Sequence, residues 1–200
     1  DYDACPCPPN VTYNPLSDII TVHAEVCDES SFGEICDILH SSQVGIGLAI
    51  NPDTELPEWC YKFAELLDQV IIMSVVPGKS GQKFIESTHE KTKRVVKDLR
   101  EHKFEGYIEA DGGVNLENIG SCFEDGARAF VGGSAIIGQN DVRMIIKEFR
   151  NQVLESRRRL LIKKAHELGG TELVNSWIDL HVVGEKKDKL VQIAKELGFQ

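Results

Sequence analysis

The sequence has no apolar run near the roughly 20 residues that a membrane-spanning helix requires. It has no excess of positive charge either, because 22 lysine and arginine residues face 32 aspartate and glutamate residues, a formal net charge of −10. Its first ten residues, DYDACPCPPN, have neither the basic flank nor the apolar stretch of a signal peptide. These absences predict a cytoplasmic protein whose partners are neither membranes nor nucleic acids, since both reward basic patches.

Paired cysteine motifs and flexible linkers are also scarce. The six cysteines are scattered, and only Cys5 and Cys7 lie close enough in the chain to share a ligand. One C-x-C pair without a second pair is weak evidence for zinc, so free thiols are expected and a zinc site is the alternative. No Gly/Ser-rich or low-complexity tract divides the 200 residues, which are therefore predicted to form one domain.

Short apolar runs alternate with amphipathic stretches over residues 16–150, the pattern of βα units and a parallel sheet. A spacing of about 25 to 30 residues per unit is typical of a (β/α)8 barrel of the TIM type, which needs eight units. Only five units can be recognised, so the α/β barrel is predicted to be incomplete. The five predicted strands cover residues 18–24, 44–50, 69–75, 106–111 and 127–133.

Glycine-rich segments follow three of these strands. In βα barrels the functional groups gather at the C-terminal ends of the strands, and glycine lets successive backbone N–H groups point at one anion. The segments therefore predict a phosphate cradle, although glycines that serve only the turns are the alternative. The residues assigned to the cradle are Gly78, Lys79, Ser80, Gly81, Gly112, Gly113, Gly133 and Ser134.

One carboxylate, Asp111, ends the fourth predicted strand among these glycine loops. A carboxylate beside bound phosphate would repel it unless a cation or a proton transfer gave it a purpose, so Asp111 is predicted to be a metal ligand, an acid/base group or both. Capping of the next helix or turn is the alternative. Met73 would form an apolar wall of the site or belong to the core. His23 and Glu25 are expected on one face of the first strand.

Several segments, in this order, resemble the ribulose-phosphate 3-epimerase family. The resemblance lies in DIITVHAE (18–25), GLAINPDT (47–54), IIMSVVPGKSGQKF (71–84), IEADGGVN (108–115) and VGGSAI (131–136). It implies a ribulose-phosphate-binding barrel enzyme, an isomerase that converts D-ribulose 5-phosphate into D-xylulose 5-phosphate with a divalent ion (Fe, Zn, Mn or Co). By this resemblance Asp111 would be a metal ligand and one of two proton-transfer carboxylates at C3. The implied partner is a small sugar phosphate, and a homo-oligomer is allowed.

The chain also departs from the family pattern. Lys79 and Ser80 stand where the family has Phe and Gly in P-G-F-G-G-Q, and the family's first three strands do not open this chain. Counting back from Pro9 places Asp1 at the second catalytic aspartate, which would also bind the metal. Residues 177–183, within a tail that covers 151–200, resemble the family's strand 3, and His181 would be a metal ligand. A rearranged epimerase is therefore one hypothesis, and a surface helix pair with a chance strand is the other.

The absent early strands bear on activity. With the second carboxylate missing or reduced to Asp1, this polypeptide alone is expected to show little or no epimerase activity. Two other readings stay open: another phosphate-binding barrel enzyme such as a hexulose-phosphate synthase-like lyase, and a non-catalytic sugar-phosphate-binding relative.

Overall fold

A computed structural model describes residues 18–167 of the chain, and in it five strands form one parallel sheet in the order β1-β2-β3-β4-β5. Each strand lies inside the residue range that the apolar runs predict. Their bounds are β1 Ile19–His23, β2 Gly45–Ile50, β3 Gln69–Met73, β4 Tyr107–Asp111 and β5 Ala129–Val131. Sequential order in a parallel sheet is the arrangement of a βα barrel, and five strands leave such a barrel incomplete.

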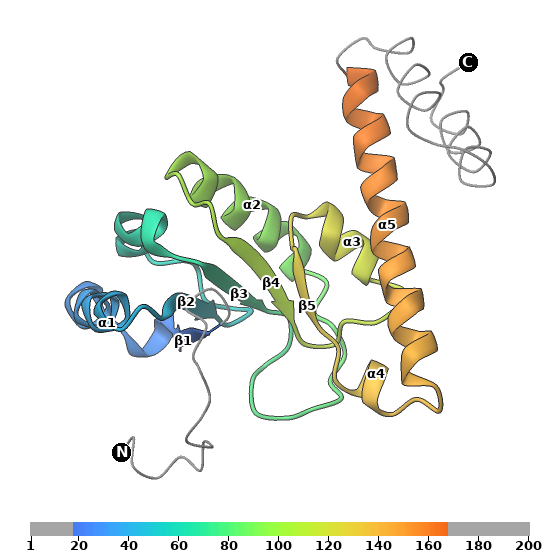
Figure 1. Cartoon of the computed structure of the whole chain (residues 1–200), viewed down its shortest axis with the longest axis horizontal. Helices are drawn as coiled ribbons and strands as arrows, with labels where there is room; N and C mark the ends of the chain where they lie inside the picture. Colours follow the sequence, from blue (N-terminus) through green and yellow to red (C-terminus); the bar gives the residue numbers. More distant parts are fainter. Residues whose placement is uncertain (1–17, 168–200) are drawn as a thin grey trace.

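Helices connect the strands, and α2, α3 and α5 lie along the same side of the sheet (Figure 1). The helical bounds are η2 Ala24–Val26, α1 Glu29–Ser41, η3 Glu58–Leu66, α2 Thr88–Glu101, α3 Ile119–Glu124, α4 Ser134–Ile137 and α5 Val142–Glu167. The short elements η2 and α4 were not expected from the sequence. The element η3 is a 3-10 helix, and the Cys60 amide at its start donates to the carbonyl of Pro57, three residues back.

The core lies between the helices and one face of the sheet. Leu48, Ile72 and Ile108, from three neighbouring strands, are at most 2% exposed. Helix α1 turns Phe32 and Cys36 toward them, one helical turn apart. Each such large side chain stabilises the fold by about 1.5 to 3 kcal/mol relative to leaving it in water.

Polar side chains are connected across several strands of the sheet. Thr21 Oγ donates to Gln69 Oε1 at 3.2 Å, and Gln69 Nε2 donates to Glu109 Oε2 at 2.7 Å. Thr21 and Gln69 belong to strands on either side of β2, and Gly47 lies between them; a Cβ on Gly47 would stand 2.1 Å from Thr21 Oγ. Because side chains alternate along a strand, Glu109 shares its face with Asp111. This hydrogen-bonded row therefore leads toward the predicted acid/base residue.

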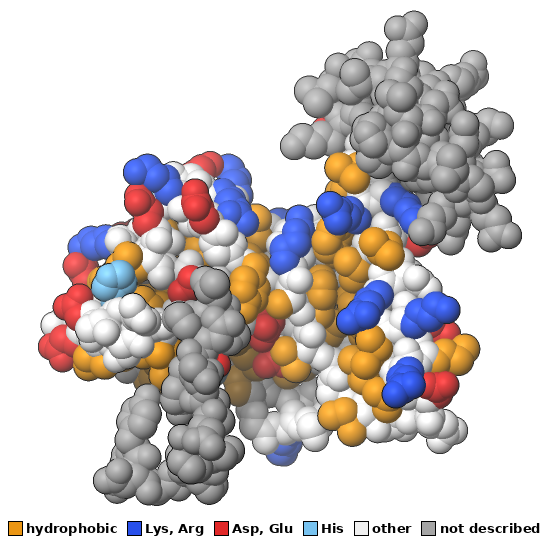
Figure 2. Space-filling view, in the orientation of Figure 1, with side chains coloured by type: hydrophobic (Ala, Val, Ile, Leu, Met, Phe, Trp, Pro, Cys, Tyr) orange, Lys and Arg blue, Asp and Glu red, His pale blue; other side chains and the backbone are white. Residues whose placement is uncertain are grey.

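Basic side chains gather over α5, interleaved with hydrophobic ones (Figure 2). Leu154 and Leu161 are about half exposed on this helix. No helix within residues 18–167 has the length and the apolar character needed to cross a bilayer. Asp1, Cys5, Cys7, His181 and the strand predicted over 177–183 lie outside the described residues, so the predictions made for them, and the single-domain prediction, stay predictions.

Candidate active site

One cavity of about 900 Å³ opens at the C-terminal ends of β3, β4 and β5. The loop after β3 and helix α4 lie at this end of the sheet (Figure 1). Every predicted site residue within 18–167 lines the cavity, although their proposed roles stay predictions. These residues are Met73, Gly78, Lys79, Ser80, Gly81, Asp111, Gly112, Gly113, Gly133 and Ser134.

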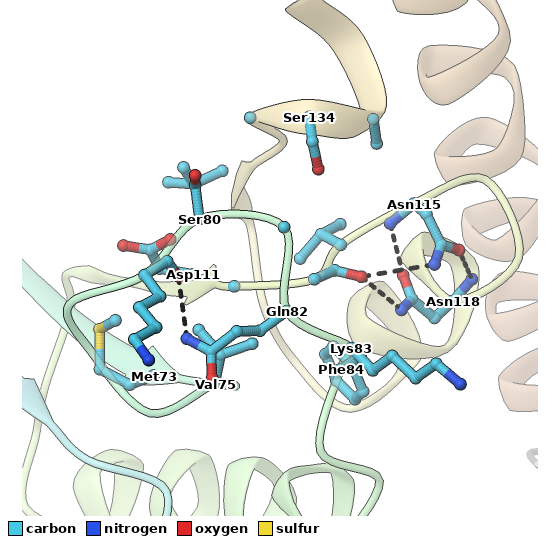
Figure 3. Close-up of a pocket in the computed structure, with 18 of the residues that line it drawn as sticks. Met73, Val75, Ser80, Gln82, Lys83, Phe84, Asp111, Asn115, Asn118 and Ser134 are labelled. Carbon is cyan, nitrogen blue, oxygen red and sulfur yellow. Dashed lines mark hydrogen bonds between the residues drawn. The ribbon is translucent and has the colours of Figure 1, made fainter. Parts of the chain in front are cut away.

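The loop after β3 is closed on itself by Gln82. Its side-chain amide donates to the carbonyl oxygens of Val76 at 2.6 Å and Lys79 at 2.8 Å, and Figure 3 shows this amide pointing back into the loop. Lys79 and Ser80 are exposed at the tip. The two residues that depart from the family pattern therefore lie where they can meet a ligand, with no packing contact that depends on them.

Backbone conformation and packing both favour glycine at the two positions after β4, whether or not a ligand binds there. Gly112 and Gly113 have φ values of 118° and 65°, the left-handed region that side chains rarely adopt. A Cβ on Gly112 would stand 2.4 Å from Val75 Cγ2, and one on Gly113 would stand 2.5 Å from the backbone N of Phe84. The alternative that these glycines serve the turn is therefore correct in part.

The remaining cradle glycines have free space around them. A Cβ on Gly78, Gly81 or Gly133 would meet no atom within 4 Å. Packing therefore does not require a glycine at these three positions, and each lines the cavity. Gly78 and Gly81 nevertheless have φ values of 108° and 73°, which favour glycine, whereas Gly133 has a φ of −71°.

Asp111 ends β4 in register with Met73 of β3, and its carbonyl oxygen accepts from the Ser74 amide at 2.7 Å. Burial raises the pKa of the Asp111 carboxyl above its ordinary value. Burial also raises the pKa of Glu109 two residues earlier, and the charge of Asp111 raises it further. The N-cap of α3 is Asn118, so Asp111 does not cap the helix that follows.

Two asparagines that the sequence did not single out hold the loop after β4. Asn118 Nδ2 donates to the Gly113 carbonyl at 3.1 Å, and Asn118 Oδ1 accepts from the Asn115 amide at 2.8 Å. Figure 3 shows Asp111 and Met73 on one side of the cavity and both asparagines on the other. The N-x-x-N spacing directly after DGGV is an Asx-turn signal that could have identified them.

The expected pairing of His23 and Glu25 on one strand face is wrong, because β1 ends at His23 and Glu25 belongs to the 3-10 turn that follows. The two side chains still meet, with His23 Nδ1 3.3 Å from Glu25 Oε2. Glu25 also accepts from the Asn51 amide at 2.7 Å, which ties the loop after β2 to β1. Neither His23 nor Glu25 lines the Asp111 cavity.

The described residues do not supply a complete metal site. Among residues 18–167, no three His, Cys, Asp or Glu side chains come together in a way that could hold an ion. Asp111 is the one predicted ligand in this range, and the other two, Asp1 and His181, fall outside it.

Comparison with known proteins identifies relatives of the chain. The model of the "Ribulose-phosphate 3 epimerase family" matches residues 11–137. The ribulose-phosphate 3-epimerase of Escherichia coli (strain K12) is 36% identical over 135 residues, 68% of this chain and 59% of the relative. That of Bacillus subtilis (strain 168) is 38% identical over 135 residues, 67% of this chain and 61% of the relative. The chain thus spans about 60% of the length of these relatives.

A solved structure supports the fold. The crystal structure of a 3-hexulose-6-phosphate synthase matches with a TM-score of 0.50 and 19% sequence identity, over 68% of this chain and 61% of that one. At this identity the likeness concerns the fold alone. Together with the parallel sheet and the family match, it confirms the (β/α)8-barrel class predicted from the sequence.

Proposed function

This chain belongs to the ribulose-phosphate 3-epimerase family, and from that premise we propose that its cavity binds D-ribulose 5-phosphate as part of a site that epimerises this substrate at C3 to D-xylulose 5-phosphate. One observation carries the proposal. Asp111, whose pKa is raised by burial, shares a single cavity with three glycine-containing loops that can bind a phosphate group.

The reaction sets the demands on the site. A base must remove the C3 proton beside the ketone, and an acid must return a proton to the opposite face of the carbon. Asp111 serves as one of the two carboxylates, and its partial burial favours a protonated form that can donate. The second carboxylate is proposed to be Asp1, outside the described residues. Because the second carboxylate is missing or reduced to Asp1, we expect the chain by itself to turn over substrate slowly or not at all.

A divalent metal ion (Fe, Zn, Mn or Co) is proposed as the cofactor, with Asp111, His181 and Asp1 as ligands. A metal of this kind would act as a Lewis acid toward the substrate oxygens. Since residues 18–167 contribute one of these ligands, no catalytic step is assigned to the ion. Metal content of the purified chain, measured by plasma mass spectrometry before and after dialysis against EDTA, tests this part.

Binding and turnover test the function. We expect the full chain to bind D-ribulose 5-phosphate in calorimetry, and the Asp111→Asn variant to bind it without loss of affinity, because the negative charge beside the phosphate is removed. Glu117→Gln is the matched control, since Glu117 is an exposed carboxylate on the same cavity. Absence of binding by the unaltered chain would overturn the proposal.

Two outcomes separate the rival functions. Binding that EDTA does not change, with no turnover and no exchange of the C3 proton, would make the chain a sugar-phosphate-binding relative without catalysis. Release of formaldehyde from D-arabino-hex-3-ulose 6-phosphate would instead indicate a hexulose-phosphate synthase-like lyase. Rapid formation of D-xylulose 5-phosphate by the chain would support the epimerase function and refute the expectation of a missing carboxylate.

A further inference from the structure

A histidine in the wall of the same cavity is held by a buried carboxylate. His89, in the first turn of α2, is hydrogen-bonded through Nδ1 to Asp125 Oδ2, and Asp125 is the C-cap residue of α3. The side chain of Asp125 is 6% exposed and that of His89 is 18% exposed. Because a carboxylate accepts, Nδ1 carries the hydrogen, and this bond fixes the orientation of the ring.

The other ring nitrogen, Nε2, lies beside an exposed carboxylate. His89 Nε2 is 3.6 Å from Oε2 of Glu86, whose side chain is 83% exposed, and both residues line the cavity. The His89 ring also packs on Phe84, with the ring centroids 4.8 Å apart. Phe84 is the residue whose backbone lies against Gly113. His89 thus packs on the residue whose backbone lies against Gly113, and its Nε2 lies beside an exposed carboxylate.

The charges around the His89 ring determine how its protonation would affect the binding of an anion. Asp125, Glu86 and Glu90 are carboxylates, and the ammonium group of Lys93 lies 3.5 Å from Asp125 Oδ1 and 2.7 Å from Glu90 Oε1. Two further lysines, Lys79 and Lys83, line the same cavity. A protonated ring offsets this negative excess, and a neutral ring leaves it to repel an arriving anion. Beside these, the titratable groups of the neighbouring elements are Cys122, kept neutral by a pKa raised to about 12, and the cavity residues Asp111 and Glu117.

We propose that His89, oriented by Asp125, is a pH-dependent contact for the phosphate group of the ligand. The protonated Nε2–H donates a charge-assisted hydrogen bond to a phosphate oxygen, in addition to the backbone amides of the glycine loops. Backbone amides do not titrate, so the His89 contact adds a pH-dependent part to anion binding, beside the effect of the carboxylates Asp111 and Glu117 that line the same cavity. The inference rests on the proposed function, because it assigns a phosphate-recognition residue to the same site.

Sulfate is the probe that isolates the effect. It remains a dianion between pH 5.5 and pH 8, whereas a phosphate monoester itself titrates near pH 6. For the full chain, we expect the sulfate affinity measured by calorimetry to fall about tenfold from pH 5.5 to pH 8. His89→Gln should bind more weakly than the unaltered chain at pH 5.5 and should lose most of the difference in affinity between the two pH values. His102→Gln, which removes a histidine stacked on Tyr61 outside the cavity, is the matched control and should keep the full pH dependence.

A second variant keeps the test decisive if His89→Gln does not fold. Asp125→Asn retains the imidazole but loses the carboxylate that orients it, so it should lose affinity at pH 5.5 and match the unaltered chain at pH 8. Unchanged pH dependence in a folded His89→Gln or Asp125→Asn variant would overturn the proposal. If the folded His89→Gln variant keeps the full pH dependence while D-ribulose 5-phosphate still displaces sulfate, only the proposed His89 contact is wrong. If D-ribulose 5-phosphate does not displace sulfate, the proposed function is wrong and the anion contact stands.

Discussion

Replacing Gly113 by alanine tests whether the anion loop depends on close backbone packing. The residue has a φ of 65°, and its new Cβ would lie 2.5 Å from the backbone N and 2.8 Å from the Cα of Phe84. A left-handed conformation costs an alanine about 1 to 2 kcal/mol. Forcing the backbone of Phe84 away adds about 1 to 3 kcal/mol, as overpacking generally does. The free energy of unfolding should therefore fall by about 2 to 5 kcal/mol.

Urea denaturation followed by circular dichroism measures this loss, and Gly133→Ala is the matched control. Gly133 has a φ of −71° and a ψ of −90°, and its Cβ would meet no atom within 4 Å, so Gly133→Ala should lose clearly less stability than Gly113→Ala. The same methyl group would stand at the cavity and weaken sulfate binding. Equal unfolding midpoints for Gly113→Ala and Gly133→Ala would refute the reasoning.

Three further predictions concern buried groups. Lys91→Met should lower the free energy of unfolding, measured by urea titration, by about 2 kcal/mol, because the buried ammonium group donates to the carbonyls of Asn51 and Thr54. Lys97→Met, at an exposed lysine, should leave the free energy of unfolding nearly unchanged. Because the pKa of Glu109 is raised in the folded chain, the free energy of unfolding should fall as the pH rises from about 4.3 through the folded-state pKa. Glu109→Gln should therefore show a smaller difference between the urea midpoints at pH 4.5 and pH 7. An unchanged difference would contradict this prediction. In the folded chain, iodoacetamide should modify the partly exposed Cys27 before the buried Cys122, whose pKa is about 12. The opposite order of modification in peptide mass spectrometry would contradict this prediction.

The sheet could be predicted because its strands are short apolar runs with one buried face. Residues 69–75 were expected as a strand and Gln69–Met73 form one, since Val70 and Ile72 must be covered by helices. The site followed from topology: parallel strands end at one edge, so loops distant in sequence must meet there. That argument predicts that Asp111 and Gly133 share one site, and both residues line the same cavity.

Contacts between side chains of distant elements could not be predicted from the sequence pattern. The hydrogen bond between His89 and Asp125 joins residues 36 positions apart, and nothing in the local pattern of either helix marks it. The contact of Thr21 with Gln69 requires the absence of a side chain at Gly47 on the strand between them. Such contacts depend on the register of neighbouring strands and helices, which periodicity alone does not determine.

Hydrogen exchange at C3 of the substrate tests the role of Asp111 most directly. In D2O, a single acid/base carboxylate can remove the C3 proton of D-ribulose 5-phosphate and return deuterium to the same face, so proton NMR should show loss of the C3 signal with little D-xylulose 5-phosphate formed. Asp111→Asn should slow this exchange by about 100-fold or more, as expected for loss of a general base. Exchange at the same rate in Asp111→Asn, or none in the unaltered chain, would contradict the assignment of Asp111 as the group that moves the proton.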